Sequence, residues 1–152
     1  MRHRLAHAIA VLAALAPLQA DAGEPLGPAL TFPRVVAGNP AYRTAWNGLL
    51  AEIPAADRDA AFMRTLAGPA TPMHAVRGDG RLLMVGTVCE PRNCNANDVI
   101  VIMVPPMGRM YALHRRRVDV PLRQRFLGHP DAAIRAILVE QAKLADRPQA
   151  AR

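Results

Sequence analysis

The clearest pattern in the chain is a pair of long apolar segments, 81–89 and 99–104, that lie close together in the sequence. In each segment both alternating sets of positions are mostly apolar, which is typical of strands covered on both faces. A short connection favours antiparallel pairing, because parallel neighbours need a crossover of about a dozen residues or more. We therefore predict two central antiparallel strands.

Shorter apolar stretches on both sides extend this sheet. Residues 73–76 predict a short strand, and the turn signal at 78–80 joins it to the first long strand as a hairpin. The turn residues at 105–108 lead into another predicted strand at 110–114, and 118–120 predicts one more. All the connections are short, so the sheet is predicted to be antiparallel throughout.

Apolar residues with helical spacing flank the strands. Asn39 and Pro40 suit an N-cap and a first helical position, and Pro54 ends the helix that they begin. Its apolar stripe consists of Tyr42, Trp46, Leu49, Leu50 and Ile53. A weaker helix is predicted over 57–67, and Gly68 and Pro69 stop it.

A last helix is predicted to begin at Pro130 and Asp131, which suit its first turn. Its mostly apolar stripe consists of Ile134, Ile137, Leu138, Gln141 and Leu144. The fold class is therefore α+β, with a central antiparallel β-sheet, flanking α-helices and a protruding loop between the two long strands.

The start of the chain predicts export. A basic beginning, a short apolar run and the small residues of Ala20-Asp21-Ala22 are typical of a signal peptide over 1–22. An uncleaved amphipathic anchor fits less well, because no charged face interrupts the apolar run. We expect a flexible lead-in at 23–38, a single domain at 39–145 and a tail at 146–152, in a periplasmic protein.

The net charge of +7 bears on the choice of partners. A basic surface can meet nucleic acid, anionic lipid or an acidic protein patch, and export argues against nucleic acid. The sharpest run of charge is Arg115, Arg116 and Arg117. It is interpreted either as a solvated edge strand, whose charge discourages aggregation, or as a patch that binds an anionic envelope surface.

The loop between the long strands contains the two cysteines of the chain. It reads Cys89, Glu90, Pro91, Arg92, Asn93 and Cys94. An oxidising compartment favours a disulfide over a redox or metal pair, and this bond would stabilise by about 2 kcal/mol. Pro91 fixes its own φ and restricts Glu90, so the loop would be rigid. Arg92 at its tip is either a cation that enters an acidic pocket or an ordinary solvated side chain.

This loop resembles that of the inhibitor of vertebrate lysozyme family, called Ivy. Members have a signal peptide, an antiparallel sheet with helices on it, and a protruding loop of the form Cys-Lys-Pro-His-Asp-Cys, which 89–94 matches at both cysteines and the proline. Val85-Gly86-Thr87 also fits the approach to the loop. The segment 127–131, Leu-Gly-His-Pro-Asp, resembles the family's Leu-Gly-Asn-Pro-Asp before its last helix. The resemblance runs from about Asn39 to Leu144.

The resemblance implies an inhibitor of a c-type lysozyme or a related muramidase. In Ivy the loop enters the active-site cleft, where its His meets the two catalytic carboxylates. Arg92 stands in the position of that His, Asn93 in that of the loop Asp and Glu90 in that of the loop Lys. The implied site is therefore Glu90, Pro91, Arg92 and Asn93. The alternative is an envelope binding or structural protein on the same fold, with Arg115, Arg116 and Arg117 as its site; a homodimer stays open.

No arrangement of residues predicts an enzyme. Beyond the predicted signal peptide the histidines are His74, His114 and His129, and their spacing suggests no metal face. We expect His114 to be solvated and His129 to be a cap or surface residue, and we expect no cofactor and no metal. The carboxylates that were considered lie in predicted turns and helix starts, where capping is the usual role; they are Glu52, Asp57, Asp59, Asp79 and Asp98.

Overall fold

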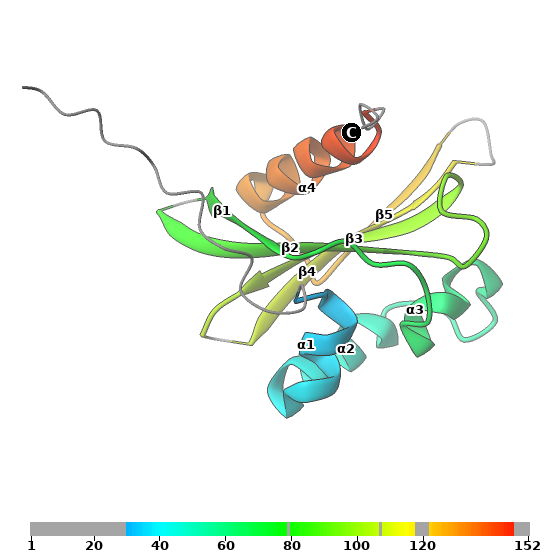
Figure 1. Cartoon of the computed structure of the whole chain (residues 1–152), viewed down its shortest axis with the longest axis horizontal. Helices are drawn as coiled ribbons and strands as arrows, with labels where there is room; N and C mark the ends of the chain where they lie inside the picture. Colours follow the sequence, from blue (N-terminus) through cyan, green and yellow to red (C-terminus); the bar gives the residue numbers. More distant parts are fainter. Residues whose placement is uncertain (1–29, 79, 107, 118–121, 148–152) are drawn as a thin grey trace, which may run out of the picture.

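The computed structural model describes residues 30–78, 80–106, 108–117 and 122–147. Five strands form one antiparallel sheet in the order β1-β2-β3-β4-β5 (Figure 1). The strands are β1 (His74–Gly78), β2 (Arg81–Cys89), β3 (Asn97–Val104), β4 (Arg109–Arg116) and β5 (Arg123–Leu127). The helices are α1 (Phe32–Gly38), α2 (Pro40–Ala51), the 3₁₀ turn η1 (Arg58–Ala60), α3 (Ala61–Thr65) and α4 (Ala132–Ala145). The α+β class predicted from the sequence is confirmed.

β3 is buried on both faces, as its apolar pattern predicts; β2 has buried residues on both faces beyond its first two positions, and Arg81 and Leu82 are exposed. All eight residues of β3 are buried, and β3 pairs with β2 from Met84↔Met103 to Cys89↔Asp98. Figure 1 shows α4 on one face of the sheet and α1, α2 and α3 on the other. One core cluster lies under the three N-terminal helices and a second lies under α4. Neighbouring residues of a strand, those of β4 included, therefore face different cores.

Helix α2 forms where its N-cap residue and its stripe of apolar residues predict it. The Asn39 side chain accepts hydrogen bonds from the backbone N–H groups of Ala41 and Tyr42, at 2.9 and 3.4 Å. Trp46 is 2 % exposed, and its indole N–H donates to the Met63 carbonyl at 3.1 Å. This bond satisfies the polar end of a buried side chain and ties α2 to α3. Trp46 is a core residue, as its position in the stripe indicates.

The expectation of a flexible lead-in over 23–38 is wrong for the part that the structure describes. Residues 32–38 form α1, with Pro33 in its first turn. Phe32 is fully buried and meets Trp46 edge to face, with ring centroids 5.0 Å apart. The burial of Phe32 thus orders a segment whose proline and glycine content indicated a loop. The helix was not predicted because the segment is too short for its few apolar residues to show a helical period.

The strand predicted at 118–120 lies outside the described residues, and the sequence missed β5 (Arg123–Leu127). Charged and polar side chains occupy its first three positions, and Leu127 is its one buried residue. An edge strand with charged residues lacks the alternating apolar pattern by which strands are recognised. β5 makes β4 an internal strand, so the interpretation of Arg115, Arg116 and Arg117 as an edge strand is also wrong.

The segment from Leu127 to Asp131 makes a sharp connection between β5 and α4. Gly128 has φ +82°, and its N–H donates to both carboxylate oxygens of Glu52, at 3.0 and 3.1 Å. Asp131 is the N-cap of α4 and accepts from the backbone N–H of Ile134 at 2.9 Å. Pro130 therefore precedes the cap, and the helix begins at Ala132, two residues after the predicted start.

Candidate binding loop

The loop between β2 and β3 lies at the end of the sheet that also carries α3 (Figure 1). A disulfide joins Cys89 to Cys94, whose Cα atoms are 4.8 Å apart, which confirms the predicted bond. The backbone N–H of Glu90 donates to the Asn97 carbonyl at 2.9 Å, so the strand ladder continues to the base of the loop. The disulfide and this bond together leave only a small turn protruding.

Residues 90–93 form a type II turn. The N–H of Asn93 donates to the Glu90 carbonyl at 3.0 Å, Pro91 occupies the second position, and Arg92 in the third has φ +64°. This third position favours Gly or Asn, because a side chain at positive φ crowds its own backbone. Holding Arg92 there costs about 1–3 kcal/mol, which the rest of the loop has to offset.

The side chains of Glu90 and Asn93 brace the turn from within. The Glu90 carboxylate accepts from Asn93 Nδ2 at 2.7 Å and from Asn97 Nδ2 at 3.1 Å. Two of the four predicted contact residues therefore hold the shape of the loop. Pro91 and Arg92 are exposed, and within the described part of the chain the Arg92 side chain has no hydrogen-bond or ion-pair partner.

The base of the loop rests on residues that the sequence interpretation did not assign to the site. The Cys89 N–H donates to the Pro69 carbonyl at 3.0 Å. A Cβ on the preceding Gly68 would lie 2.0 Å from the Cys89 carbonyl oxygen, so only glycine fits. On the other side, the carbonyls of Ala96 and Asn95 accept from the Arg117 N–H and Nη1, at 2.7 and 3.2 Å.

Asn97 connects the loop to the interior of the sheet. Its Nδ2 donates to Glu90, so its Oδ1 faces inwards and accepts from His114 Nε2 at 2.8 Å. His114 is 6 % exposed and lies 6.1 Å from the Phe62 ring, between centroids. The expectation of a solvated His114 is wrong because β4 is internal and this side chain faces the core under α3.

The three consecutive arginines do not form one surface. Arg115 is 1 % exposed and grips the Asp98 carboxylate with Nε and Nη2, at 2.9 and 2.6 Å. Arg117 lies on the same face and pairs with Asp98 at 3.0 Å and with Asp146 at 2.7 Å. Arg116 points to the opposite face. The basic patch proposed from the sequence is therefore corrected: one member is buried, and the other two belong to different sites.

The same finding corrects the role predicted for Asp98. It is a buried residue of β3, directly opposite Arg115 in the register, and it is no cap. A signal for it is present in the sequence. Asn97 and Asp98 are two polar residues that begin an otherwise apolar strand, and polar residues in such a position need partners of their own.

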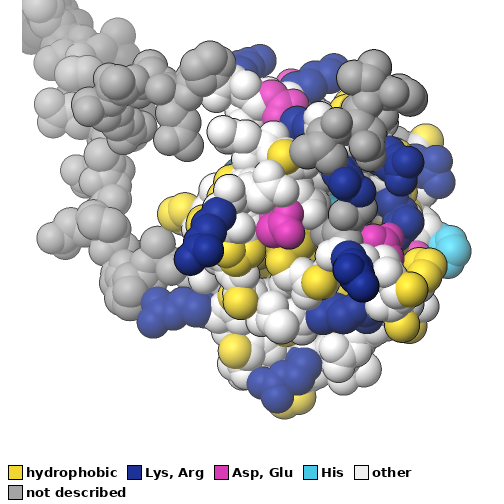
Figure 2. All heavy atoms as spheres, turned by 90° about the vertical axis from the view of Figure 1, so that its right-hand side faces the viewer, with side chains coloured by type: hydrophobic (Ala, Val, Ile, Leu, Met, Phe, Trp, Pro, Cys, Tyr) yellow, Lys and Arg dark blue, Asp and Glu magenta, His cyan; other side chains and the backbone are white. Residues whose placement is uncertain are grey.

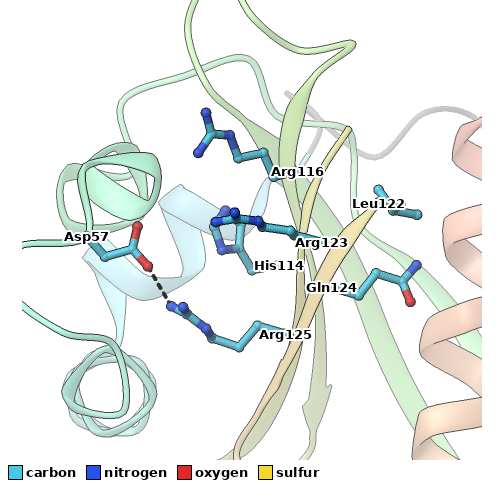
Figure 3. Close-up of a pocket in the computed structure, with 7 residues that line it drawn as sticks. All are labelled: Asp57, His114, Arg116, Leu122, Arg123, Gln124 and Arg125. Carbon is cyan, nitrogen blue, oxygen red and sulfur yellow. Dashed lines mark hydrogen bonds and ion pairs between the residues drawn. The ribbon is translucent and has the colours of Figure 1, made fainter. Parts of the chain in front are cut away.

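Figure 2 looks onto the end of the molecule where this loop lies, and Lys and Arg side chains predominate over acidic ones there. A pocket of about 500 Å³ lies between β4, β5 and η1. Figure 3 shows His114, Arg116, Arg123 and Arg125 on its sheet side, turned towards Asp57. Arg125 Nη1 is 2.7 Å from Asp57 Oδ2. This pocket could not be predicted from the sequence, since β5 itself was missed.

The remaining predicted candidates lie apart from the loop. His74 on β1 contacts Gln141 of α4 at 2.9 Å, and His129 is exposed before α4. The described residues contain no group of three or more His, Cys, Asp or Glu side chains that could hold a metal ion. They also include no helix of the length and apolar character that a membrane crossing requires.

Comparison with known proteins places the chain in a family. No family model matches it. Over 114 residues it is 34 % identical to a protein of Pseudomonas aeruginosa with the name "Uncharacterized protein PA5481", an alignment that covers 67 % of this chain and 70 % of that protein. The chain therefore belongs to the same protein family as PA5481, whose name assigns no activity.

Proposed function

We propose that this protein is exported to the periplasm and inhibits a c-type lysozyme or a related muramidase by inserting the loop 89–94 into its active-site cleft. The observation that carries the proposal is the state of Arg92. It stands at the tip of a braced, disulfide-closed turn, exposed, at positive φ and without a partner among the described residues. Backbone strain that the surroundings maintain is found preferentially at functional sites.

The chemistry of the target cleft suits this tip. Retaining glycosidases hold two carboxyl groups on either side of the scissile bond, one protonated and one ionised. The Arg92 guanidinium can donate two parallel hydrogen bonds to the ionised carboxylate. Because the turn is already rigid, little conformational entropy is lost on binding. The inhibitor performs no chemistry and acts by excluding the substrate.

The bracing of the turn also supports the resemblance to Ivy. Positions 90 and 93 carry Glu and Asn here, and their side chains are bonded to each other at 2.7 Å. The Ivy motif has Lys and Asp at these positions, so its donor lies at the first position and its acceptor at the second, the reverse of the arrangement here. A cross-turn contact could thus be kept while both residues change. At the tip itself the replacement is Arg92 for His; Asn93 is also exposed, but its side chain is bonded to Glu90 within the turn.

The alternative, an envelope binding protein that uses Arg115, Arg116 and Arg117, has less support. Arg115 is buried against Asp98, and the Arg117 guanidinium is shared between Asp98 and Asp146. Neither presents its charge to a large anionic surface. We therefore keep the loop as the proposed site and do not propose this surface as a second one.

The test is a cell-wall lysis assay in which the purified, oxidised protein is titrated into a c-type lysozyme. Three variants accompany it: Arg92→Asn, Arg92→His and the control Arg77→Gln. Asn tolerates positive φ, so the first variant removes the cation and keeps the turn. Arg77 is an exposed arginine on β1 and corrects for the loss of one charge.

We expect saturable inhibition by the natural chain and by Arg77→Gln, and its loss in Arg92→Asn. Inhibition that is unchanged in Arg92→Asn would overturn the role of the loop tip. No inhibition by the natural chain, with inhibition gained in Arg92→His, would show that the loop has another target. No inhibition by any variant would remove the lysozyme proposal altogether.

A further inference from the structure

A second pocket lies among the three N-terminal helices, on the face of the sheet opposite α4, and its base is apolar. It has a volume of about 450 Å³, within the range of small-molecule sites. Val36 of α1 and Trp46 of α2 line it and are 5 % and 2 % exposed, so they belong to its base. Leu66, directly after α3, lines its side and packs against the same core cluster. The apolar surface of this helical pocket is therefore fixed by the core.

Two arginines that line the helical pocket are held by neutral groups. Arg43 of α2 donates to two carbonyl oxygens near the end of α1. Arg64 Nη2 of α3 donates to the carbonyl oxygens of Ile53 and Pro54, at 3.3 and 3.2 Å. Within the described part of the chain neither guanidinium has an ion-pair partner, and no Asp or Glu lines the pocket. The carbonyls orient both cations and leave their charge unbalanced.

Part of each guanidinium also remains available to a ligand. A guanidinium has five N–H donors, and the bonds to carbonyls engage Nε and Nη2 of Arg43 and Nη2 of Arg64. Nη1 of each arginine has no hydrogen-bond partner among the described residues. The exposed Asn47 lies one helical turn after Arg43, on the same side of α2, and also lines the pocket. The rim therefore offers hydrogen-bond donors around an apolar base.

We propose that the helical pocket binds a small amphipathic anion, with a carboxylate or phosphate head on an apolar body. The guanidinium fork matches the oxygens of either head, and the apolar base suits the body. The carbonyls already hold both arginines, so less side-chain entropy is lost when a ligand binds. The described lining residues are few, whereas a stable protein interface has about 20–30 residues a side, which favours a small ligand over a protein segment.

The competing explanation is that both arginines only cap the carbonyl groups at helix ends. A capping arginine stabilises the fold with or without a ligand, so stability alone does not separate the two explanations. Asn47→Asp does, because the Asn47 side chain makes no hydrogen bond within the described residues. The change leaves the caps intact and puts a negative charge one helical turn from Arg43.

Trp46 reports directly on this pocket, because it lines the pocket and is the one tryptophan of the chain. The test is a titration of the full protein with octanoate, octyl phosphate, octanol and acetate, read by tryptophan fluorescence and by the indole N–H resonance. The variants are Arg43→Gln and Asn47→Asp. The control is Arg34→Gln, an exposed arginine of α1 that does not line the pocket. Thermal unfolding without ligand reports whether each variant is folded.

We expect both octyl anions to shift the Trp46 signals saturably. Octanol should bind about tenfold more weakly or worse, because the charged hydrogen bonds are lost. Acetate should bind about a hundredfold more weakly or worse, since each buried CH₂ strengthens binding about fourfold. Arg43→Gln should weaken both anions about tenfold and Asn47→Asp about fivefold, because the new carboxylate repels the head. Arg34→Gln should change the affinity less than about twofold.

Three results would overturn the proposal. The first is a folded natural chain in which neither octyl anion produces a saturable shift. The second is binding of octanol as tight as that of octanoate, which would leave the arginines without a role. The third is a folded Asn47→Asp variant that binds both anions as tightly as the natural chain. The titration contains no lysozyme, and the pocket shares no residue with the loop 89–94, so this proposal and the proposed function can fail separately.

Discussion

His114 Nε2 donates a hydrogen bond to Asn97 Oδ1 over 2.8 Å, and this contact joins the core of the sheet to the candidate binding loop. The other end of the Asn97 amide donates to Glu90, which in turn accepts from Asn93. The shape of the exposed turn is therefore set by a buried residue of β4. It does not depend on the disulfide alone.

Replacement of Asn97 should loosen this loop. Asn97→Ala removes the acceptor of the buried His114 Nε2–H and one of the two donors to Glu90 Oε2, at a cost of about 1–3 kcal/mol in the free energy of unfolding. Amide hydrogen exchange should accelerate at Glu90 and Asn93 more than at the strand centre. Asn95→Ala is the control, because only the backbone carbonyl of Asn95 bonds to Arg117. Equal exchange in both variants would contradict the bracing role of Asn97.

The Arg115–Asp98 pair should matter far more to stability than surface pairs do. Asp98→Ala leaves a buried guanidinium partly uncompensated, and we expect a loss of about 3–5 kcal/mol in the free energy of unfolding. Urea denaturation measures it. The exposed Lys143–Glu140 pair, 3.7 Å apart, is the comparison, and Glu140→Gln should cost less than about 1 kcal/mol. A similar small loss in Asp98→Ala would mean that Asp146 alone can hold Arg115.

Gly68 should tolerate no side chain. In Gly68→Ala the new Cβ would meet the Cys89 carbonyl oxygen, which is backbone and cannot rotate away, so the end of β2 has to move. We expect a destabilisation of about 1–3 kcal/mol, measured by denaturation. The matched control is Gly48→Ala in α2, where nothing lies within 4 Å and the helix should gain about 0.5–1 kcal/mol. A neutral Gly68→Ala would show that the base of the loop is soft.

The sequence predicted those parts of the fold in which local pattern and tertiary packing agree. The strands β2 and β3 and the capped helix α2 follow directly from apolar periodicity and from Asn39. Helix α1 was not predicted because its formation depends on the burial of one aromatic residue, Phe32. β5 was not predicted because an edge strand that lines a charged pocket has no alternation of apolar and polar residues.

The candidate site divides in the same way. The disulfide and the exposed position of Arg92 could be predicted from six consecutive residues. The supports of the loop could not, because Gly68, Asn97 and Arg117 come together only through the register of the sheet. Likewise, three adjacent arginines appear as one patch in the sequence, while the alternation of a strand sends Arg116 to the face opposite Arg115.

The last prediction concerns the strain at the loop tip. Glycine adopts positive φ without steric cost, so Arg92→Gly should relieve about 1–3 kcal/mol of strain and lose about 0.5–1 kcal/mol to backbone entropy. The variant should therefore be at least as stable as the natural chain, whereas Arg92→Val, with a β-branched side chain, should be less stable than both. Urea denaturation of oxidised protein gives the order.

Paired with the lysis assay, this order separates stability from function. If Arg92→Gly is the more stable protein and has lost inhibition, the strained arginine is kept for its contact with a partner. If Arg92→Gly is destabilised, the guanidinium stabilises the fold itself, and the strain at Arg92 no longer supports a role in binding.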